Sequence, residues 1–404
     1  MQRVRASLPI LASAVLLSAC NAGNVTSAGL PRASNGSSVL QTRWPGSAGR
    51  ADGAGYVYVV NFGSGGPSSS NVSAYAIGTT GALSPVAGSP FAAGNDPVGV
   101  AIDPTGKFAY VDNAGFKSNS ISGYTIDASS GALSPVPGSP FAAGSTPYYV
   151  AIDPRGRFAY APNVSGSNVS AYAINATSGA LTPVSGSPFA TGSGPHYVAV
   201  DPSGKFAYVP NASSGNVSAY RIDSATGALT PVAGSPFAAG SYPEGLAVEP
   251  TGKFVNVANS NSNNISAYAI DASSGALRAV RGSPFPAGSF PLAVAADPTA
   301  PFVYVAGGDN SVWGYTIRPN SGRLTPVPGS PFAAGTDPEG VAVDATGKFA
   351  YVANDGSNNV SAYSIDATTG ALTPVAGSPF GAGFGPYGIA TCRVKHNRCT
   401  PPPL

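Results

Sequence analysis

The chain has 404 residues, and 43% of them are hydrophobic, which is enough apolar sequence to build a core. Only 9% are charged and the formal net charge is +2, so the charge balance argues against a nucleic-acid partner. Glycine and proline are abundant, at 52 and 39 residues, a composition that without a period would indicate a low-complexity chain.

Residues 1–20 have the parts of a secretory signal. Arg3 and Arg5 precede an apolar stretch from Leu8 to Leu17, which is too short to cross a membrane as a helix. The sequence Leu-Ser-Ala-Cys that ends at Cys20 resembles the lipobox of bacterial lipoproteins, and the resemblance implies cleavage before Cys20 and lipidation of its thiol. Asn21 follows, which in that family implies the outer membrane. We therefore expect an outer-membrane lipoprotein with the membrane as a partner; the alternative is ordinary secretion with an incidental Cys20.

Residues 21–55 have no period and are rich in Gly, Ser, Ala and Asn. Such a composition buries too little apolar surface to fix one conformation. We expect a flexible tether between the lipid anchor and the domain that follows.

A repeat begins at Tyr56 and continues to Thr391. The sequence GSPF recurs seven times, with spacings of 50, 48, 48, 48, 47 and 48 residues. Its phenylalanines are Phe91, Phe141, Phe189, Phe237, Phe285, Phe332 and Phe380. A fixed period of this length is typical of propeller or solenoid repeats.

The third repeat shows four β-prone runs separated by turns. The first, VAID, enters an Asp-Pro-Arg-Gly turn at 153–156, and FAYAPN at 158–163 follows. The third run, NVSAYAI at 168–174, leads through Gly179 to LTPV. Pro183 cannot donate to a ladder, so LTPV is predicted as the outer edge. Four strands in each repeat predict an all-β, seven-bladed β-propeller with four antiparallel strands per blade.

The two ends of the array predict how the ring closes. The first repeat begins with the second strand type at Tyr56–Asn61, and the last repeat ends with the first strand type at 386–391. Pairing of these segments would complete blade one and leave no open edge. We therefore expect the propeller to span residues 56–391 and to be monomeric.

Residues 392–404 form a C-terminal tail that contains Cys392 and Cys399. Disulfides persist in an oxidising cell envelope, so we expect these two cysteines to pair. The alternative is a metal site that includes His396, but this spacing matches no common zinc pattern. We expect no metal and no cofactor.

The inner strands of a propeller line its central channel, so the residue after the proline that opens each inner strand should ring the channel mouth. In blade order these residues are Tyr387, Val98, Tyr148, His196, Glu244, Leu292 and Glu339. Tyr387, Tyr148 and Glu339 are candidate binding residues for a small molecule or an envelope protein. His196 is a candidate general acid or base, and Glu244 on the next blade is its candidate partner. The alternative is that these side chains only fill the channel.

At the level of the repeat, PxxVAIDPTGKFAYVxN followed by NVSAYxID and GALTPVxGSPF resembles the seven-bladed propeller lactonase family, which includes 6-phosphogluconolactonases and carboxy-muconate cyclases. It is also similar to YVTN-type surface repeats. In one blade of those lactonases, Pro-His precedes the inner strand and Asp follows the second strand. In the next blade, Arg-His and Glu stand at the corresponding places. Here Pro195-His196 matches the first pair. Asn211, Glu244-Gly245 and Ser260 stand at the other places.

The resemblance therefore keeps one of five site residues and replaces a cationic Arg by the anion Glu244. Two hypotheses follow. The preferred one is a lipid-anchored binding or scaffold module that acts through its channel mouth, with Asn211 among the binding residues. The alternative is a lactonase that acts on an uncharged lactone with His196 as the general base.

Overall fold

The computed structural model describes residues 55–63, 70–115, 118–395 and 398–402. By compactness the chain divides into two units, Met1–Ala48 and Gly49–Leu404, and every described residue lies in the second unit. The expected signal, Cys20, the tether and His396 lie outside the described residues. Within the described residues, no helix has the length and apolar character needed to cross a membrane.

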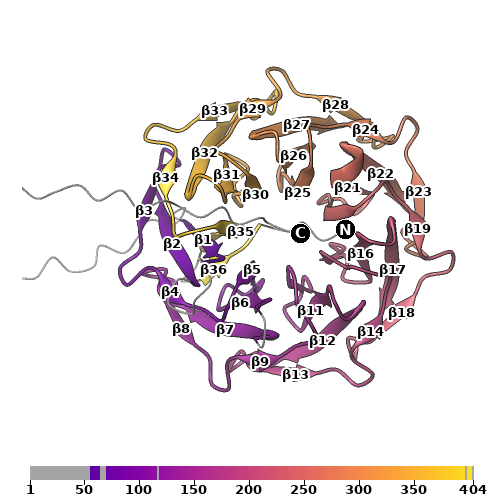
Figure 1. Ribbon diagram of the computed structural model, residues 1–404, viewed down its shortest axis with the longest axis horizontal. Helices are drawn as coiled ribbons and strands as arrows, with labels where there is room; N and C mark the ends of the chain where they lie inside the picture. The colour runs from indigo at the N-terminus through magenta and orange to yellow at the C-terminus, as the bar shows by residue number, and fades with distance from the viewer. Residues whose placement is uncertain (1–54, 64–69, 116–117, 396–397, 403–404) are drawn as a thin grey trace, which may run out of the picture. The chain divides into compact units, whose positions relative to one another are not determined.

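The described residues form seven antiparallel sheets arranged as blades around a centre (Figure 1). In blade three the sheet order is β10 (Ala151–Ile152), β11 (Phe158–Asn163), β12 (Asn168–Ile174) and β13 (Leu181–Pro183), from inside to outside. The short β14 (Phe189–Ala190) also pairs with β12, so two segments share the outer position. The predicted all-β, seven-bladed propeller with four strand positions per blade is confirmed.

The other blades repeat this order. The inner strands are β5 (Pro97–Ile102), β15 (Ala199–Val200), β20 (Pro243–Val248), β25 (Pro291–Ala296), β30 (Pro338–Val343) and β35 (Pro386–Lys395). The second strands are β1 (Gly55–Asn61), β6 (Phe108–Asn113), β16 (Phe206–Asn211), β21 (Phe254–Asn259), β26 (Phe302–Gly307) and β31 (Phe349–Asn354). The third strands are β2 (Asn71–Ile77), β7 (Ser120–Ile126), β17 (Asn216–Ile222), β22 (Asn264–Ile270), β27 (Ser311–Ile317) and β32 (Asn359–Ile365).

The outer position is divided in every blade. Its first segments are β3 (Leu83–Pro85), β8 (Leu133–Pro135), β18 (Leu229–Pro231), β23 (Leu277–Ala279), β28 (Leu324–Pro326) and β33 (Leu372–Pro374). Its second segments are β4 (Phe91–Ala92), β9 (Phe141–Ala142), β19 (Phe237–Ala238), β24 (Phe285–Pro286), β29 (Phe332–Ala333) and β34 (Phe380–Gly381). The only helix among these residues is the 3-10 turn η1 (Ser260–Ser262), and β36 (Arg398–Thr400) follows β35.

Blade one closes the ring as predicted. Its sheet has the order β3-β2-β1-β35-β36, so the last inner strand pairs with the first strand of the array. β35 continues to Lys395, and β36 pairs with it through Val394 and Cys399. The expected boundary at residue 391 therefore falls inside a strand, and the segment expected as a tail extends the sheet.

Cys392 occupies the position at which the other six inner strands have a buried acid. In blade three that acid is Asp153, whose carboxylate accepts hydrogen bonds from the backbone N–H groups of Arg157 and Phe158 and so holds the turn between β10 and β11. Blade one has no such turn, because its first two strands are the two ends of the array. There Cys392 forms a disulfide with Cys399 instead. The disulfide holds β36, whose Cys399 N–H donates to the Gly106 carbonyl of blade two at 3.2 Å.

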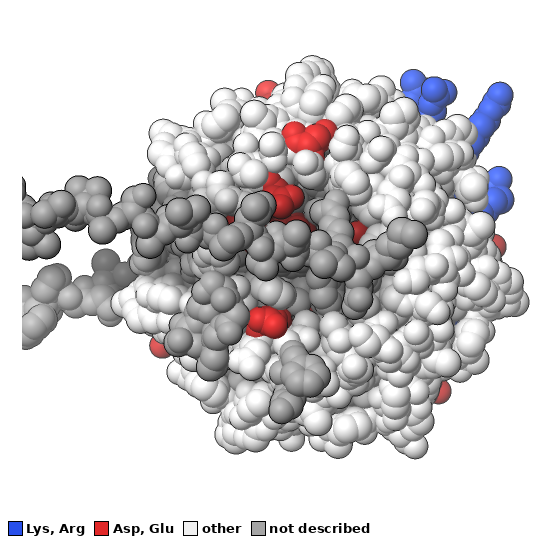
Figure 2. All heavy atoms as spheres, in the orientation of Figure 1, with Lys and Arg blue, Asp and Glu red and all other residues white. Residues whose placement is uncertain are grey.

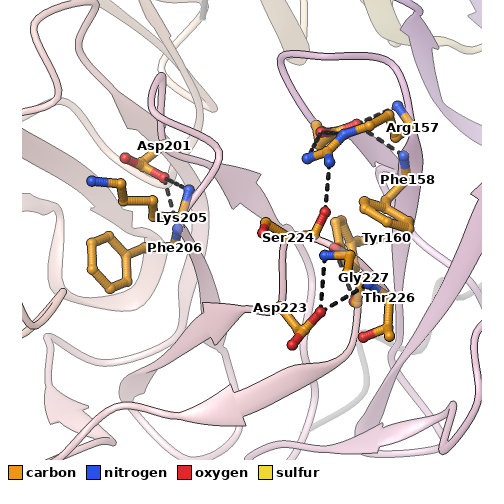
Figure 3. Close-up of polar contacts among 12 residues, drawn as sticks. Arg157, Phe158, Tyr160, Asp201, Lys205, Phe206, Asp223, Ser224, Thr226 and Gly227 are labelled. Atoms are coloured by element: carbon orange, nitrogen blue, oxygen red, sulfur yellow. Dashed lines mark hydrogen bonds and ion pairs between the residues drawn. The ribbon is translucent and has the colours of Figure 1, made fainter.

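The core lies between neighbouring blades. One hydrophobic cluster combines Phe108 and Tyr110 of blade two with Ile152 and Tyr172 of blade three. Polar contacts cross the same boundaries, and Figure 3 shows one of them: the Tyr160 hydroxyl donates to the Gly227 carbonyl at 3.0 Å. Arg157 pairs with Asp153 of its own blade at 3.2 Å. It also donates to the Ser224 carbonyl of the next blade at 2.6 Å (Figure 3).

The tyrosine contact recurs at six of the seven blade boundaries, with hydroxyl-to-carbonyl distances of 2.8–3.1 Å. Its donors are Tyr58, Tyr110, Tyr160, Tyr208, Tyr304 and Tyr351. The boundary between blades five and six differs, because Asn256 stands at the tyrosine position. Its side chain is 1% exposed and neither of its polar atoms has a hydrogen-bond partner.

Candidate active site at the channel mouth

The inner strands begin around a small cavity at the channel mouth. The cavity has a volume of about 20 Å³, which is room for about one water-sized group. It is lined by Tyr148, Tyr149, His196, Tyr197, Glu244, Gly245, Leu292, Ala293, Glu339 and Tyr387. Six of the seven residues predicted to ring the mouth therefore meet there. Val98 does not line the cavity: its side chain is fully buried.

Tyr149 and Tyr197 were missed by the sequence analysis. The repeat has glycine at this position in four blades, where the inner strand passes close to its neighbour: a Cβ at Gly245 would lie 2.3 Å from the Leu292 carbonyl oxygen. With tyrosine there, β10 and β15 shorten to two residues each, and Tyr149 takes a left-handed φ of 45°. The replacement of a repeated glycine by an aromatic residue was the signal available in the sequence.

His196 and Glu244 come from neighbouring blades and lie close together. The His196 Nδ1 atom is 3.7 Å from the Glu244 Oε2 atom and has no hydrogen-bond partner. The other oxygen of Glu244 accepts a hydrogen bond of 2.9 Å from the Ser260 hydroxyl, which fixes the carboxylate. The His196 ring lies beside Tyr148, with ring centroids 5.2 Å apart, and edge-on to Tyr242 at 5.5 Å. These contacts restrict the orientation of the imidazole.

Glu339 is the second carboxylate of the cavity. Burial raises its pKa to about 8, and the nearby carboxylates of Glu244, Asp355 and Asp337 add to the shift. Tyr148 and Tyr387 share a hydrogen bond of 2.9 Å between their hydroxyls. Burial raises the pKa of both hydroxyls, so they stay protonated at neutral pH. On the face shown in Figure 2, acidic residues lie both toward the middle of the ring and at its rim, whereas the basic residues lie at one edge.

Asn211, predicted as a binding residue, does not line the mouth cavity. It is fully buried, and its amide nitrogen donates to Asn216 at 2.8 Å and to Ser218 at 2.9 Å in the next strand. Its carbonyl oxygen accepts from the Thr191 hydroxyl at 2.9 Å. Equivalent asparagines in other blades make the same donor contacts, for example Asn259 to Asn264 and Ser266. Asn211 therefore holds the end of its hairpin together.

Two further features lie near the mouth cavity. A separate cavity of about 700 Å³ occupies the channel beyond the tyrosines, and Tyr197 lines both. Its wall includes an alanine from every blade. These alanines are Ala101, Ala151, Ala199, Ala247, Ala295, Ala342 and Ala390. Among the described residues, the one group of acids spaced to hold a metal ion is Asp337, Glu339 and Asp355, whose nearest oxygens lie within 4.8 Å of one another.

Comparison with known proteins identifies the family. The sequence profile of the family described as "Lactonase, 7-bladed beta-propeller" matches residues 56–194 and 190–382, which is most of the chain. The chain belongs to this family. No curated protein matches the chain.

Three solved structures with a similar fold have names that mention a lactonase. A protein from Bacteroides fragilis provisionally assigned as a 6-phosphogluconolactonase has a TM-score of 0.74 and 20% identity, and covers 85% of this chain and 99% of its own. Its counterpart from Bacteroides uniformis has a TM-score of 0.73 and 20% identity, with coverage of 84% and 99%. The Pseudomonas aeruginosa periplasmic gluconolactonase has a TM-score of 0.70 and 21% identity, with coverage of 84% and 100%. At these identities the likeness establishes the fold.

The family match corrects the preferred functional prediction. The sequence analysis favoured a non-catalytic binding or scaffold module, and the lactonase profile contradicts that preference and favours the lactonase alternative. The preference rested on four family positions that this chain does not keep. Two of the residues that stand there, Glu244 and Ser260, are hydrogen-bonded to each other beside His196.

Proposed function

We propose that the protein is a lactonase that opens an uncharged lactone at the channel mouth, with His196 as the general base. The observation that carries the proposal is the meeting of His196 and the fixed carboxylate of Glu244 in one small cavity of a lactonase-family propeller. The cavity has room for about one water-sized group, which is what a hydrolytic nucleophile requires.

The reaction needs one proton transfer in each direction. Water attacks the lactone carbonyl while His196 accepts a proton from it. The tetrahedral intermediate then loses the ring oxygen as the ring C–O bond breaks, and the imidazolium returns its proton to that oxygen, which leaves a hydroxy acid. Glu244, at 3.7 Å from His196, stabilises the imidazolium that forms between the two transfers.

The charge of the site supports an uncharged substrate over a phosphorylated one. Glu244 and Glu339 line the cavity, and within the described chain no Lys or Arg does. A phosphate placed there would lie beside the Glu244 carboxylate with no compensating cation. The name of the Pseudomonas aeruginosa structure, a periplasmic gluconolactonase, agrees with an exported enzyme for an unphosphorylated lactone.

We also propose that the enzyme works in the cell envelope as a lipoprotein held by Cys20. The lipobox-like sequence Leu17-Ser18-Ala19-Cys20 supports this location. An enzyme there is separated from cytosolic sugar phosphates, which agrees with the charge of the mouth.

The test compares ring opening of D-glucono-δ-lactone and its 6-phosphate by base uptake at constant pH, after subtraction of the spontaneous rate. We expect turnover of the uncharged lactone only, and a loss of about 10²- to 10⁴-fold in His196→Ala. The matched control is Lys205→Gln, which lies on the Asp-Pro turn of blade four and should keep full activity. A rate equal to the spontaneous one, or full activity in His196→Ala, would overturn the proposal.

A further inference from the structure

Asp112 is a buried acid that the proposed hydrolysis does not use. It lies on β6 of blade two, one residue before the end of the strand, and its side chain has no exposure to solvent. The other six blades have apolar residues at this position, which are Val60, Pro162, Pro210, Ala258, Ala306 and Ala353. The scaffold therefore needs no acid there. A buried carboxyl is costly unless its oxygens are bonded, and one oxygen of Asp112 has no partner.

The other oxygen of Asp112 makes a contact across a blade boundary. Its Oδ2 atom accepts a hydrogen bond of 2.5 Å from the backbone N–H of Val150 in blade three. Val150 directly follows Tyr148 and Tyr149, which both line the mouth cavity. The bond therefore connects blade two to the segment that supplies two tyrosines of the candidate active site.

The backbone of that segment is turned relative to the other blades. Tyr149 has a φ of 45°, in the left-handed region that residues other than glycine rarely adopt. At Gly245 and Gly388, a Cβ would lie 2.3 Å from a backbone carbonyl oxygen of the next blade. At the equivalent Gly99, the nearest atoms would be the Tyr149 Cα at 2.5 Å, the Asp112 Oδ2 at 2.8 Å and the Tyr149 nitrogen at 2.9 Å. The peptide before Tyr149 therefore turns its nitrogen toward blade two, where the equivalent peptides turn a carbonyl oxygen.

Blade four shows that tyrosine at this position does not by itself turn the backbone. Tyr197 is the equivalent of Tyr149 there, and its φ is not left-handed. The residue that stands before it at the position of Asp112 is Pro162, whose side chain has no acceptor. The turned backbone thus occurs beside the carboxyl. An acceptor at Asp112 bonds the Val150 N–H, and it would repel a carbonyl oxygen turned the other way.

The turned segment places aromatic rings against the proposed base. The Tyr148 ring centroid lies 5.2 Å from that of His196, and the Tyr148 hydroxyl shares a hydrogen bond of 2.9 Å with that of Tyr387. The Tyr149 ring lies 5.0 Å from Tyr197. A change of φ at Tyr149 redirects the chain on both sides of it, so the Tyr148 ring would not keep these contacts in the backbone conformation of the other blades.

We propose that Asp112 is a positioning residue of the active site: by accepting the Val150 N–H, it holds the turned backbone at Tyr149 and so keeps the Tyr148 ring against His196. Asp112 does not line the mouth cavity, so it acts on the reaction only through the orientation of the base. Its effect on the rate rests on the proposed lactonase function, whereas its effect on the surroundings of His196 does not.

The test uses three substitutions of Asp112 in the full chain. Asp112→Asn keeps an acceptor oxygen, whereas Asp112→Ala and Asp112→Val introduce residues that other blades have at this position. The first measurement is the NMR resonance of the His196 imidazole in protein with labelled histidine, assigned by its loss in His196→Ala, because a neighbouring aromatic ring shifts such a resonance. We expect the resonance to move toward that of a histidine in an unfolded chain in Asp112→Ala and Asp112→Val, and to stay in place in Asp112→Asn.

The second measurement is the rate of D-glucono-δ-lactone opening. We expect kcat to fall at least about tenfold in Asp112→Ala with KM changed less than about twofold, and Asp112→Asn to keep most of the rate. The matched control is Asp297→Ala. Asp297 is also a buried acid with an unpartnered oxygen, and it accepts the Thr299 and Ala300 N–H groups in a turn of blade six. Its replacement should lower the melting temperature but leave the His196 resonance and the rate unchanged.

The outcomes separate the two proposals. An unmoved His196 resonance in folded Asp112→Ala or Asp112→Val, or a resonance that moves as far in Asp112→Asn or in Asp297→Ala, would overturn the positioning role. If the resonance responds as expected but the wild type opens no lactone, the positioning of His196 stands and the lactonase proposal fails. If the wild type opens the lactone and neither the resonance nor the rate responds to Asp112→Ala, the lactonase proposal stands and the positioning role fails.

Discussion

Replacing Asn256 by tyrosine should stabilise the ring at the one boundary that lacks the tyrosine contact. The surroundings of the acceptor carbonyl are the same there: Gly322 lies against Phe254 as closely as the equivalent Gly275 lies against Phe206, so that a Cβ on either glycine would be 2.3 Å from the phenylalanine. In Asn256→Tyr the hydroxyl would reach the Gly322 carbonyl, as Tyr208 reaches Gly275 at 3.1 Å. The substitution also removes the two polar atoms of Asn256 that have no partner.

The size of the effect follows from three contributions. A buried polar atom without a partner costs about 1 to 3 kcal/mol, and Asn256 has two of them. The new hydrogen bond adds about 1 kcal/mol, and imperfect packing of the larger side chain subtracts about 1 to 3 kcal/mol. We expect a net gain of about 3 kcal/mol in the free energy of unfolding. With an unfolding entropy of about 2.1 cal/mol/K per residue over roughly 340 residues, this raises the melting temperature by about 4 °C.

The assay is chemical denaturation followed by circular dichroism, supported by calorimetric melting. Tyr208→Asn is the reciprocal control and should lower the denaturation midpoint, because it creates at Tyr208 the defect that Asn256 has now. Tyr208→Phe removes only the hydroxyl and should cost less. If Asn256→Tyr lowers the midpoint while Tyr208→Asn also lowers it, the space at position 256 does not accommodate the ring. If neither changes it, the tyrosine contacts contribute nothing to stability.

Three further predictions concern other parts of the chain. Burial raises the pKa of Asp112, a carboxyl with one unpartnered oxygen, to about 7. The folded state then holds a proton that the unfolded state loses near pH 4, so this group should lower the free energy of unfolding by roughly 2 to 4 kcal/mol as pH rises from 4 to 7. Asp112→Asn should remove this part of the pH dependence in denaturation curves. Reduction of the Cys392–Cys399 disulfide should lower the free energy of unfolding by about 2 kcal/mol, measured with and without reductant against Cys399→Ser, which should not respond. Cys20→Ser should release the protein from membranes or stall its processing in cell fractionation; a mature, membrane-bound variant would contradict the lipid anchor.

The fold was predictable because the same pattern of strands and turns recurs in seven repeats. The period, the Asp-Pro turns and the complementary half-blades at the two ends were enough to predict the number of blades and the pairing of β1 with β35. Two details of the fold were not predicted from the sequence. The outer position is shared by two short segments such as β13 and β14, because Pro183 ends the first and GSPF begins a second. The role of Cys392 was visible only once the register showed it at the position of Asp153.

The site was predictable where the repeat varies and not where it is regular. His196, Glu244 and Glu339 stood out because the scaffold needs no particular residue at their position, and they meet in one cavity. Asn211 was misassigned because a family position was carried over without the information that asparagine closes the same hairpin in other blades. The hydrogen bond from Ser260 to Glu244 could not be predicted, because a sequence does not give the distance between two side chains. In the structure this bond fixes the carboxylate of Glu244 beside the imidazole of His196, where the family has a different set of residues.

The central claim is that His196 is the base of a lactonase, and chemical rescue tests it most directly. His196→Ala leaves a space of the shape of an imidazole ring beside Tyr148 and Glu244. The measurement is the rate of D-glucono-δ-lactone opening by His196→Ala as free imidazole is added, corrected for catalysis by imidazole alone. We predict that added imidazole raises the rate of His196→Ala at least about tenfold and that the rise saturates, whereas the rate of the wild type does not rise. A rate that stays flat, or that rises equally in both proteins, would contradict the assignment.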